Sequence, residues 1–325
     1  SDASIKKRGQ NVIFDSHFLL RRYGIRTYNL EDTMVAQGII YPELRKGLDF
    51  ITAMWTDIPY YKRDGKVWLE GGGDWENGWR YNCNDVLSCA SAHPQQLTLL
   101  TTQGNISTYE RQRLLIPPLT YMMERGIKID LEGMQRAGQE CKEEMEALTE
   151  RLSIMMERDC IPDNSYATKG KSQFNLSSTQ QLCKYFYEEK GLTPYLNPDT
   201  KQPTTNITAL TRLANKGVRE ASLLLTLRKL AKRRSTFLDI TKPDSDGRMR
   251  CSYNPVGTKY GRISSSETIF ESGMNLQNVP HDVLTHFVAD EGYILYSLDM
   301  SQIENRIVAY VGNILPMIQA FENGQ

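Results

Sequence analysis

The clearest hydrophobic pattern of the chain lies between residues 130 and 160. Apolar side chains recur there at steps of three and four residues, which is the spacing of one face of an α-helix. The members of this stripe are Met134, Ala137, Cys141, Met145, Leu148, Leu152 and Met155. The pattern predicts a long amphipathic helix within a mostly helical region, residues 111–158. A stripe of this kind is more often a packing seam than a functional surface.

Further helices are predicted on both sides of this one. Residues 206–238 read as a second long amphipathic helix. The stretch between the two, residues 159–205, is loop-rich because it carries four prolines. A short helix interrupts it, and Ser177 with Gln180 has the spacing of a capping box at its start.

The first 110 residues show a mixed pattern. Short apolar runs alternate there with helical stretches such as 15–23 and 84–93. Residues 61–77 contain Gly65 and three consecutive glycines, so they are expected to form a hairpin or a loop insertion.

A strand is expected near the C-terminal end, where residues 247–298 return to strand and turn patterns. Ile294, Tyr296 and Leu298 alternate with other residues, and the run leads directly into Asp299. A carboxylate at a strand end, beside the start of a helix, suits a divalent metal held near a phosphate.

The residues after Asp299 predict that helix. Ser301 and Glu304 have capping-box spacing. The apolar stripe of the helix consists of Ile303, Ile307 and Val311. The chain is therefore expected to be α/β at first, then helical, and then to begin a sheet.

Composition narrows the class of protein. Hydrophobic residues make up 40% of the chain, and no apolar run reaches the roughly 18 residues that a membrane span needs. The first residues lack the apolar core of a signal peptide. Six cysteines show no C-x-x-C pair, which favours reduced thiols. We therefore expect an intracellular protein of a bacterial or infected host cell, with no membrane partner.

Charge is balanced in total but not along the chain. The formal net charge is zero. Residues 228–262 hold ten Lys or Arg against three acids, whereas residues 263–325 hold one Arg against eight acids. A basic surface beside an acidic one suits a protein that grips a phosphate backbone next to metal ions. Two solvated faces of opposite sign explain the same numbers equally well.

Three sequence elements together resemble family A (DNA polymerase I-like) DNA polymerases. Asp299–Arg306 is similar to the family's motif A, D-x-S-Q-I-E-x-R. Gly257–Ser265 and Asn275–Pro280 are similar to its G-T-x-T-G-R-L-S-S and N-L-Q-N-I-P elements, in the same order and at short spacing. Segments resembling the start of the thumb and the thumb itself extend the likeness over residues 111–325. These are Leu119–Asp130, Phe174–Ser178 and Leu227–Asp239.

The resemblance implies catalytic roles at motif A. Asp299 would bridge two Mg²⁺ ions, which Mn²⁺ could replace, and the carbonyl of Met300 would be a further ligand. Glu304 would be the steric gate against a ribose 2′-hydroxyl, although the capping box alone explains a Glu there. Arg306 would order the active site, or it is an ordinary arginine on a helix surface.

The resemblance also implies primer–template DNA and a dNTP as partners. The primer and template would be contacted near the growing end by Arg262, Asn275, Gln277 and Asn278. The phosphates of the duplex would be bound, independently of the base sequence, by Lys229, Lys232 and Arg233.

Some positions depart from the family pattern. Tyr260 replaces a Thr, Met300 replaces the usual Tyr, His286 stands where an Arg is common, and residues 267–274 are extra. These departures indicate a divergent, phage-type branch.

The first 110 residues resemble a DnaQ-like 3′–5′ proofreading exonuclease. Asn11–Asp15 and Tyr81–Asp85 are similar to its second and third motifs. Asp15 and Asp85 would then be metal ligands, and Tyr81 would orient the attacking water. Each motif alone also occurs by chance in surface segments. The first motif, D-x-E, is not found before residue 11, so the chain starts late or the exonuclease is inactive.

Taken together, the resemblance implies an α/β multidomain protein. Residues 1–110 would be a partial DnaQ/RNase H-like exonuclease domain, 111–245 a connecting helix and helical thumb, and 246–325 the start of an α+β palm. Polymerisation would require a C-terminal part with the fingers and the remaining palm carboxylates, in the same enzyme or in a second polypeptide of a split polymerase. The alternatives are an exonuclease with a vestigial polymerase half and a non-catalytic DNA-binding module.

Overall fold

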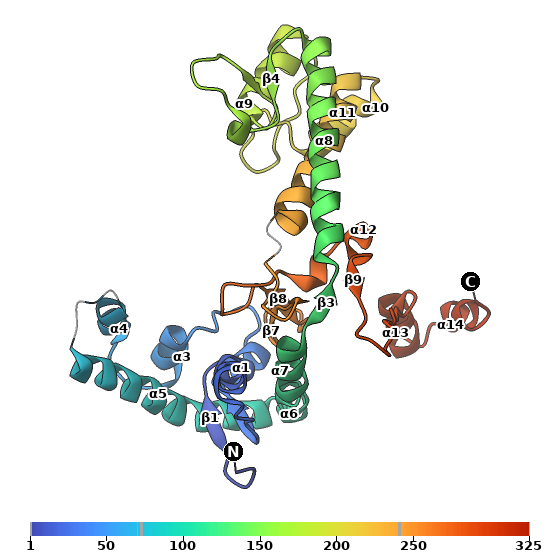
Figure 1. Ribbon diagram of the computed structural model, residues 1–325. Helices are drawn as coiled ribbons and strands as arrows, with labels where there is room; N and C mark the ends of the chain where they lie inside the picture. Colours follow the sequence, from blue (N-terminus) through green and yellow to red (C-terminus); the bar gives the residue numbers. More distant parts are fainter. Residues whose placement is uncertain (1, 70, 72–73, 240–241, 325) are drawn as a thin grey trace. The chain divides into compact units, whose positions relative to one another are not determined.

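The computed structural model describes residues 2–69, 71, 74–239 and 242–324. These residues form two compact units, Ser1–Phe287 and Val288–Gln325. Figure 1 traces the elements of each unit along the chain.

The N-terminal part of the first unit is built on a small parallel sheet. Strands β1 (Lys7–Gly9) and β2 (Leu30–Asp32) pair in register from Lys7 opposite Leu30. The helices that follow them are α1 (Val12–Tyr23), α2 (Thr33–Ile40), α3 (Leu48–Trp55), α6 (Ile106–Arg113) and α7 (Ile116–Arg125). Their apolar faces share one core with the end of α5 (Trp75–Thr102), and Val35, Leu100 and Ile116 are fully buried in it. The α/β pattern expected for this region is present, with only two strands in the sheet that the described residues form there.

Asp32 connects the starts of two of these helices. Its carboxylate is the N-cap of α2 and accepts a 2.8 Å hydrogen bond from the Met34 amide. It also accepts from the Asn11 amide at 3.0 Å and from the Val12 amide at 2.8 Å, where α1 begins. One fully buried side chain therefore satisfies free amides at two helix N-termini.

The prediction of a loop at residues 61–77 is wrong for most of that segment. Helix α4 (Lys62–Leu69) occupies the first half of this segment, and helix α5 (Trp75–Thr102) begins within its last three residues. Residues 70, 72 and 73, from the glycine run, lie outside the described residues. Gly65 permits close helix packing rather than a turn, because a Cβ there would lie 2.3 Å from the Tyr81 ring.

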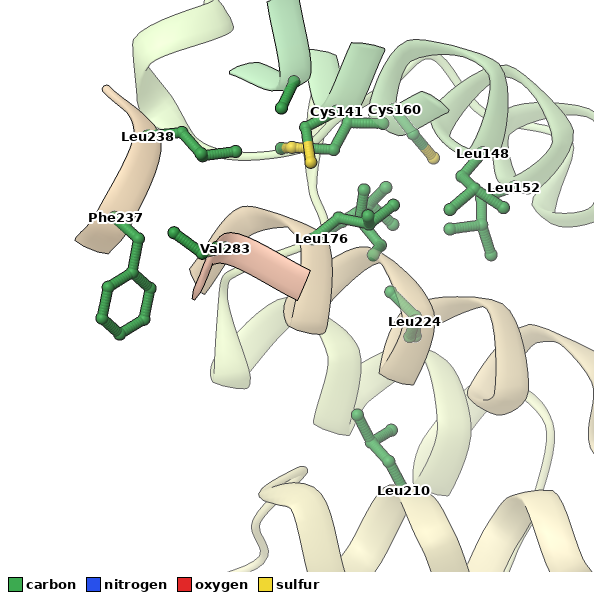
Figure 2. Close-up of a cluster of buried hydrophobic side chains, with 14 of the residues drawn as sticks. Cys141, Leu148, Leu152, Cys160, Leu176, Leu210, Leu224, Phe237, Leu238 and Val283 are labelled. Carbon is green, nitrogen blue, oxygen red and sulfur yellow. The ribbon is translucent and has the colours of Figure 1, made fainter. Parts of the chain in front are cut away.

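The long helix predicted from the apolar stripe Met134–Met155 is confirmed. Helix α8 (Leu131–Met156) buries six of the seven predicted positions. Met155 is 38% exposed, and Met156 takes its place in the core at 4%. Figure 2 shows Cys141, Leu148 and Leu152 of α8 in the cluster of buried side chains that includes Leu210 and Leu224.

Residues 206–238 do not form one continuous helix. They divide into α10 (Ile207–Asn215), α11 (Arg219–Arg233) and a π-helical turn, η3 (Arg234–Leu238). Gly217 adopts φ +86° between α10 and α11, a conformation that ends the first helix and allows the second to fold back. Helix α11 packs along α8, and α10 packs on α11 (Figure 1).

The helix predicted inside the loop-rich region is shifted by one residue. Helix α9 (Thr179–Cys183) is capped by Ser178, whose hydroxyl accepts from the Gln181 amide at 3.4 Å. Ser177 instead donates to the Asn175 side chain at 2.8 Å. The capping pair is therefore Ser178 and Gln181. Short strands β4 (Cys160–Ile161) and β5 (Phe174–Asn175) and a turn, η1 (Asn164–Tyr166), precede it, and the π-helical η2 (Lys184–Glu189) follows.

Short strands recur in the first part of the expected strand-and-turn region 247–298, as far as residue 288. Strand β3 (Ile127–Ile129) lies between β6 (Arg248–Met249) and β9 (Phe287–Val288) in one sheet. Strands β7 (Ser252–Asn254) and β8 (Ser264–Ser266) form an antiparallel pair. The turn η4 (Leu276–Asn278) and helix α12 (His281–Leu284) complete this region.

The expected strand before Asp299 is absent from the described residues. Residues 293–300 have no strand assignment, and Leu298 is 94% exposed. A strand forms only against a partner, and among the described residues none pairs with this segment. The alternating side chains consequently lie in solvent.

The capping box predicted at Ser301 and Glu304 is also wrong. Helix α13 (Ile303–Val311) begins after Gln302, which is the N-cap in a left-handed conformation and makes no side-chain cap. The predicted stripe is exposed, from 38% at Ile303 to 83% at Val311. Helix α14 (Leu315–Glu322) follows in the same unit.

Two expectations from composition can be compared with the described residues. None of their helices has the length and apolar character required to cross a bilayer. All six cysteines are free thiols, as expected.

Candidate functional sites

The Asp299 carboxylate stands open to solvent in the second unit. Its side chain is exposed, and within the described residues no hydrogen bond or ion pair engages it. The neighbouring Met300 carbonyl accepts the Ile303 amide at 3.3 Å. Asp299 and Met300 thus present two hard oxygen donors on consecutive residues, which is the donor type that Mg²⁺ prefers.

Arg306 braces the loop that follows Asp299. Its Nε donates to the Ser301 carbonyl at 2.9 Å, and its guanidinium lies 4.8 Å from the centre of the Phe321 ring. The side chain therefore ties α13 to both the loop and α14. Glu304 lies in the first turn of the same helix and is exposed.

The two predicted primer elements meet in space. The Ser265 hydroxyl, on β8, lies 2.6 Å from Asn275 Oδ1 and 3.0 Å from Gln277 Oε1. Gln277 Nε2 donates to the Ile263 carbonyl at 3.2 Å. Asn275 also caps η4, and Gln277 and Asn278 remain exposed.

Arg262 lies in the turn between strands β7 and β8. Thr258 Oγ1 accepts from the Arg262 amide at 2.9 Å and donates to its carbonyl at 3.1 Å, which closes the turn. The Arg262 side chain is exposed on this turn.

The three cations predicted to grip phosphate differ in their surroundings. Lys229 and Lys232 are exposed on α11, three residues apart and so on one side of the helix. Arg233 is half-buried, with its Nε 2.8 Å from Asp282 of α12. Arg233 therefore has a structural partner, whereas the two lysines face solvent.

Residues 267–274 fold into a compact turn that reaches α1. The Thr268 amide donates to the Ser272 carbonyl at 3.0 Å. At the tip, the Phe270 ring lies 5.5 Å from the His17 ring and 6.2 Å from the Phe18 ring. The Arg22 guanidinium lies 5.3 Å from its centre.

The predicted exonuclease residues lie on α1 and α5. Asn11 is the left-handed N-cap of α1, and Asp15 is exposed in its first turn. Asp85 Oδ1 accepts from the Tyr61 hydroxyl at 2.7 Å and from Lys62 Nζ at 2.5 Å. Tyr81 accepts from the same ammonium at 3.0 Å.

Comparison with known proteins identifies the family. The model of DNA polymerase family A matches residues 142–325. The chain belongs to DNA polymerase family A. It is 30% identical to the DNA polymerase I of Rhizobium leguminosarum, over 99% of this chain and 31% of that protein. The thermostable DNA polymerase I of Thermus filiformis is 30% identical over 66% of this chain and 25% of its own length. The chain thus spans a third or less of these two curated relatives.

A solved structure shares the fold. The POL domain of Pol1 from M. smegmatis, in complex with a DNA primer-template and dNTP, superposes with a TM-score of 0.73. The match covers 96% of this chain and 51% of that one, at 23% sequence identity. The mixed helix and sheet arrangement of this family A chain is therefore that of a polymerase domain.

Potential metal ligands do not cluster within the described part of this family A chain. No group of three or more His, Cys, Asp or Glu side chains there could hold a metal ion. Asp299 and Met300 offer oxygen donors of the kind that Mg²⁺ prefers. Asp85 does not fit a metal site as it stands, because an ammonium already bonds its carboxylate.

Sequence reasoning missed Lys62 and Ser265. The signal for Lys62 was the Tyr60–Arg63 run, in which two aromatic residues precede two cations. Ser265 stands within one of the motifs, and no pattern in the sequence marks it as the residue that joins the two primer elements.

A buried polar cluster around Tyr109 of α6 was also missed. His93 is fully buried, 2.9 Å from the Tyr109 hydroxyl and 3.7 Å from a Glu31 carboxylate oxygen. Burial, with Arg8 adding to it, lowers the pKa of His93 to about 4. The Tyr109 hydroxyl accepts from the Asp32 amide at 3.2 Å, so this cluster supports the strand end where Asp32 caps two helices.

Proposed function

We propose that this chain is part of a template-directed DNA polymerase that adds dNTPs to a primer 3′ end. The observation that carries the proposal is the open Asp299 carboxylate, placed in a segment matched to DNA polymerase family A. The related POL domain was solved in complex with a DNA primer-template and dNTP, which supports the same partners for this chain.

Asp299 and the Met300 carbonyl would hold divalent metal, Mg²⁺ or Mn²⁺. In a two-metal phosphoryl transfer, the bound ions lower the barrier by stabilising charge on the attacking and leaving oxygens. The protein's own contribution at this point is to offer carboxylate oxygens that no other side chain among the described residues occupies.

Glu304 and Arg306 would shape the nucleotide site. Arg306 keeps the loop after Asp299 in place through its bond to the Ser301 carbonyl. Glu304, in the first turn of the same helix, would exclude a ribose 2′-hydroxyl by its bulk.

Primer and template would be held by two surfaces. Arg262, Asn275, Gln277 and Asn278 form the first, whose two loops are joined by Ser265. Lys229 and Lys232 form the second, which would bind phosphates electrostatically. Arg233 would support this surface through Asp282 rather than bind DNA itself.

A second carboxylate and a triphosphate site are also required. We propose that a further segment of the enzyme, or a second polypeptide, supplies the fingers and the remaining palm carboxylates. The solvent-exposed segment 293–300 supports this proposal, because its apolar side chains have no strand to pair with in the described residues.

The finer assignments rest on the family resemblance alone. They are a proofreading exonuclease origin for residues 1–110, a thumb in 111–245, a palm start in 246–325, a phage-type branch and an intracellular location. An exonuclease with a vestigial polymerase half and a non-catalytic DNA-binding module remain the rival functions.

The test is primer extension by the complete protein carrying Asp299→Asn. Extension should fall by about a thousandfold or more, since removing an essential catalytic group costs about that much, while duplex binding stays unchanged. Glu291→Gln, at another exposed acid upstream, is the matched control and should remain active. Full extension by the Asn variant would favour the DNA-binding module. Metal-dependent 3′ degradation without extension in the unmodified protein would favour the exonuclease.

A further inference from the structure

Lys62 is held at Asp85 by several contacts at once. Its Nζ lies 2.5 Å from Asp85 Oδ1 and 3.0 Å from the Tyr81 hydroxyl. The Tyr61 hydroxyl bonds the same Asp85 oxygen at 2.7 Å. One carboxylate oxygen thus receives both an ammonium and a phenol.

Aromatic rings enclose the ammonium. Lys62 Nζ lies 5.0 Å from the centre of the Tyr61 ring and 4.8 Å from that of Tyr81. The Lys62 side chain is only 17% exposed. Distances of this size are within the range of cation–π attraction, which is stronger when water is excluded.

The charged form of Lys62 is favoured in this setting. Burial alone would lower the pKa of Lys62, but the hydrogen bonds to Asp85 and Tyr81 and the Asp85 charge outweigh it and raise the pKa. The ammonium is therefore a permanent charge at neutral pH.

Helix packing fixes the position of Lys62. A Cβ at Gly65 of α4 would lie 2.3 Å from the Tyr81 ring, and a Cβ at Gly78 of α5 would lie 2.6 Å from the Trp68 ring. These two glycines let α4 and α5 approach closely. Lys62 is thus placed by the docking of a whole helix rather than by one free side-chain rotamer.

A lysine ammonium and a divalent metal compete for the same carboxylate. We propose that Lys62 is the resident cation of the Asp85 site and excludes divalent metal from it. The inference rests on the proposed exonuclease origin of residues 1–110, in which Asp85 would be a metal ligand. If the proposal is right, Lys62 and Asp85 form a structural ion pair, and Asp85 takes no part in metal-dependent cleavage of 3′ ends.

The experiment is iron-dependent backbone cleavage of the complete protein. Fe²⁺ binds sites that take Mg²⁺, and with ascorbate and peroxide it cuts the chain close to where it binds. Fragments identified by mass spectrometry report the Asp85 site through cuts near residues 81–88. Cuts near Asp299 in the same sample are the internal reference.

Four variants isolate the role of Lys62. Lys62→Met should raise cutting near residues 81–88 by about tenfold, the size of effect expected when a neighbour of a metal ligand changes. Lys62→Arg keeps the charge and should cut like the unmodified protein. Adding Asp85→Asn to Lys62→Met should abolish the new cuts. Lys62→Gln is the second neutral variant, and circular dichroism checks that each variant remains folded.

Each outcome bears on the proposal. Equal cutting near residues 81–88 in the unmodified protein and in the two neutral variants would overturn it. Absence of such cuts from folded neutral variants would overturn it as well, because Lys62 would then not be what excludes the metal. A separate assay with 3′-labelled single-stranded DNA distinguishes the two ideas. If Lys62→Met binds metal at Asp85 but does not degrade the 3′ end, the role of Lys62 is upheld and the exonuclease origin is not.

Discussion

The Ser265 hydroxyl lies 2.6 Å from the side-chain oxygen of Asn275, and this contact joins two loops that both resemble primer-binding elements. The same hydroxyl is 3.0 Å from Gln277 Oε1. A small side chain on β8 therefore sets the spacing of two amides that we expect to face the primer–template.

Ser265→Ala should weaken primer–template binding. Loss of a neutral hydrogen bond costs about 1 kcal/mol, which corresponds to a rise of about fivefold in the Kd for duplex DNA. Fluorescence anisotropy with a labelled hairpin measures it. Ser266→Ala is the control, because among the described residues the Ser266 hydroxyl bonds the adjacent Glu267 carbonyl alone. Equal Kd values for the two variants would argue against the joining role.

Lys229 and Lys232 should behave differently from Arg233. Each Lys→Ala change should reduce the slope of log Kd against log salt by about 1, since one phosphate contact is lost. Arg233→Ala should leave that slope nearly unchanged and lower the thermal midpoint, because it leaves Asp282 of α12 without its ion partner. Salt titrations of duplex binding and thermal unfolding of the same three proteins test this. A slope change for Arg233→Ala equal to that of the lysines would contradict the assignment.

Arg306→Lys should slow nucleotide addition more than it weakens DNA binding. The substitution keeps the charge but loses the planar group that bonds the Ser301 carbonyl and stacks on Phe321. We expect kcat/KM for dNTP to fall by about tenfold, the equivalent of about 1.4 kcal/mol. Phe321→Leu removes only the ring and should cause a smaller loss. Steady-state extension with saturating primer–template gives kcat/KM for dNTP for both variants.

Asp32→Ala should destabilise the N-terminal region strongly. It leaves several buried amides of α1 and α2 without an acceptor, and each unsatisfied buried group costs about 1–3 kcal/mol. Asp74→Ala is the matched control, because Asp74 caps only the exposed start of α5 through the Asn77 amide and should cost about 1 kcal/mol. Urea unfolding followed by tryptophan fluorescence compares the two. A smaller loss for Asp32→Ala than for Asp74→Ala would contradict the double-capping role.

His93 should contribute a rise in stability with pH between about 4 and 6.5, which the raised pKa of Asp32, about 6, opposes in the same window. The folded protein keeps this histidine neutral down to a pKa of about 4, whereas a histidine in the unfolded chain takes up a proton near pH 6.5. At His93 the unfolded state then binds more protons in this window, so this contribution to the free energy of unfolding falls as pH falls. His93→Gln should lower the slope of the profile by up to about 1.4 kcal/mol per pH unit. Urea unfolding at several pH values gives the slope, and parallel profiles would count against a buried neutral His93.

The sequence predicted those features that depend on local periodicity. The stripe of α8 is an example, since six of its seven positions are buried and only the last turn shifts from Met155 to Met156. The family resemblance also selected the two loops that Ser265 joins. Both results follow from information within a few dozen consecutive residues.

The errors arose where distant residues decide the structure. A strand at 294–298 requires a neighbour, and the alternation of Ile294, Tyr296 and Leu298 says nothing of whether one is present. Gly65 suggested a turn, but its role depends on Tyr81, which lies on another helix. The pairs Lys62–Asp85 and Arg233–Asp282 likewise become visible only when the helices that carry them are packed.

The turn at residues 267–274 has a consequence for how this chain can be divided. Phe270, at its tip, is enclosed by His17, Phe18 and Arg22 of α1, while its base leads from Ser265 into Asn275. Residues 267–274 thus connect helix α1 to the two loops that contain Ser265 and Asn275. Removing residues 1–110 would leave the Phe270 ring without these packing partners, so we expect the N-terminal region to help position the two loops whether or not it has chemistry of its own.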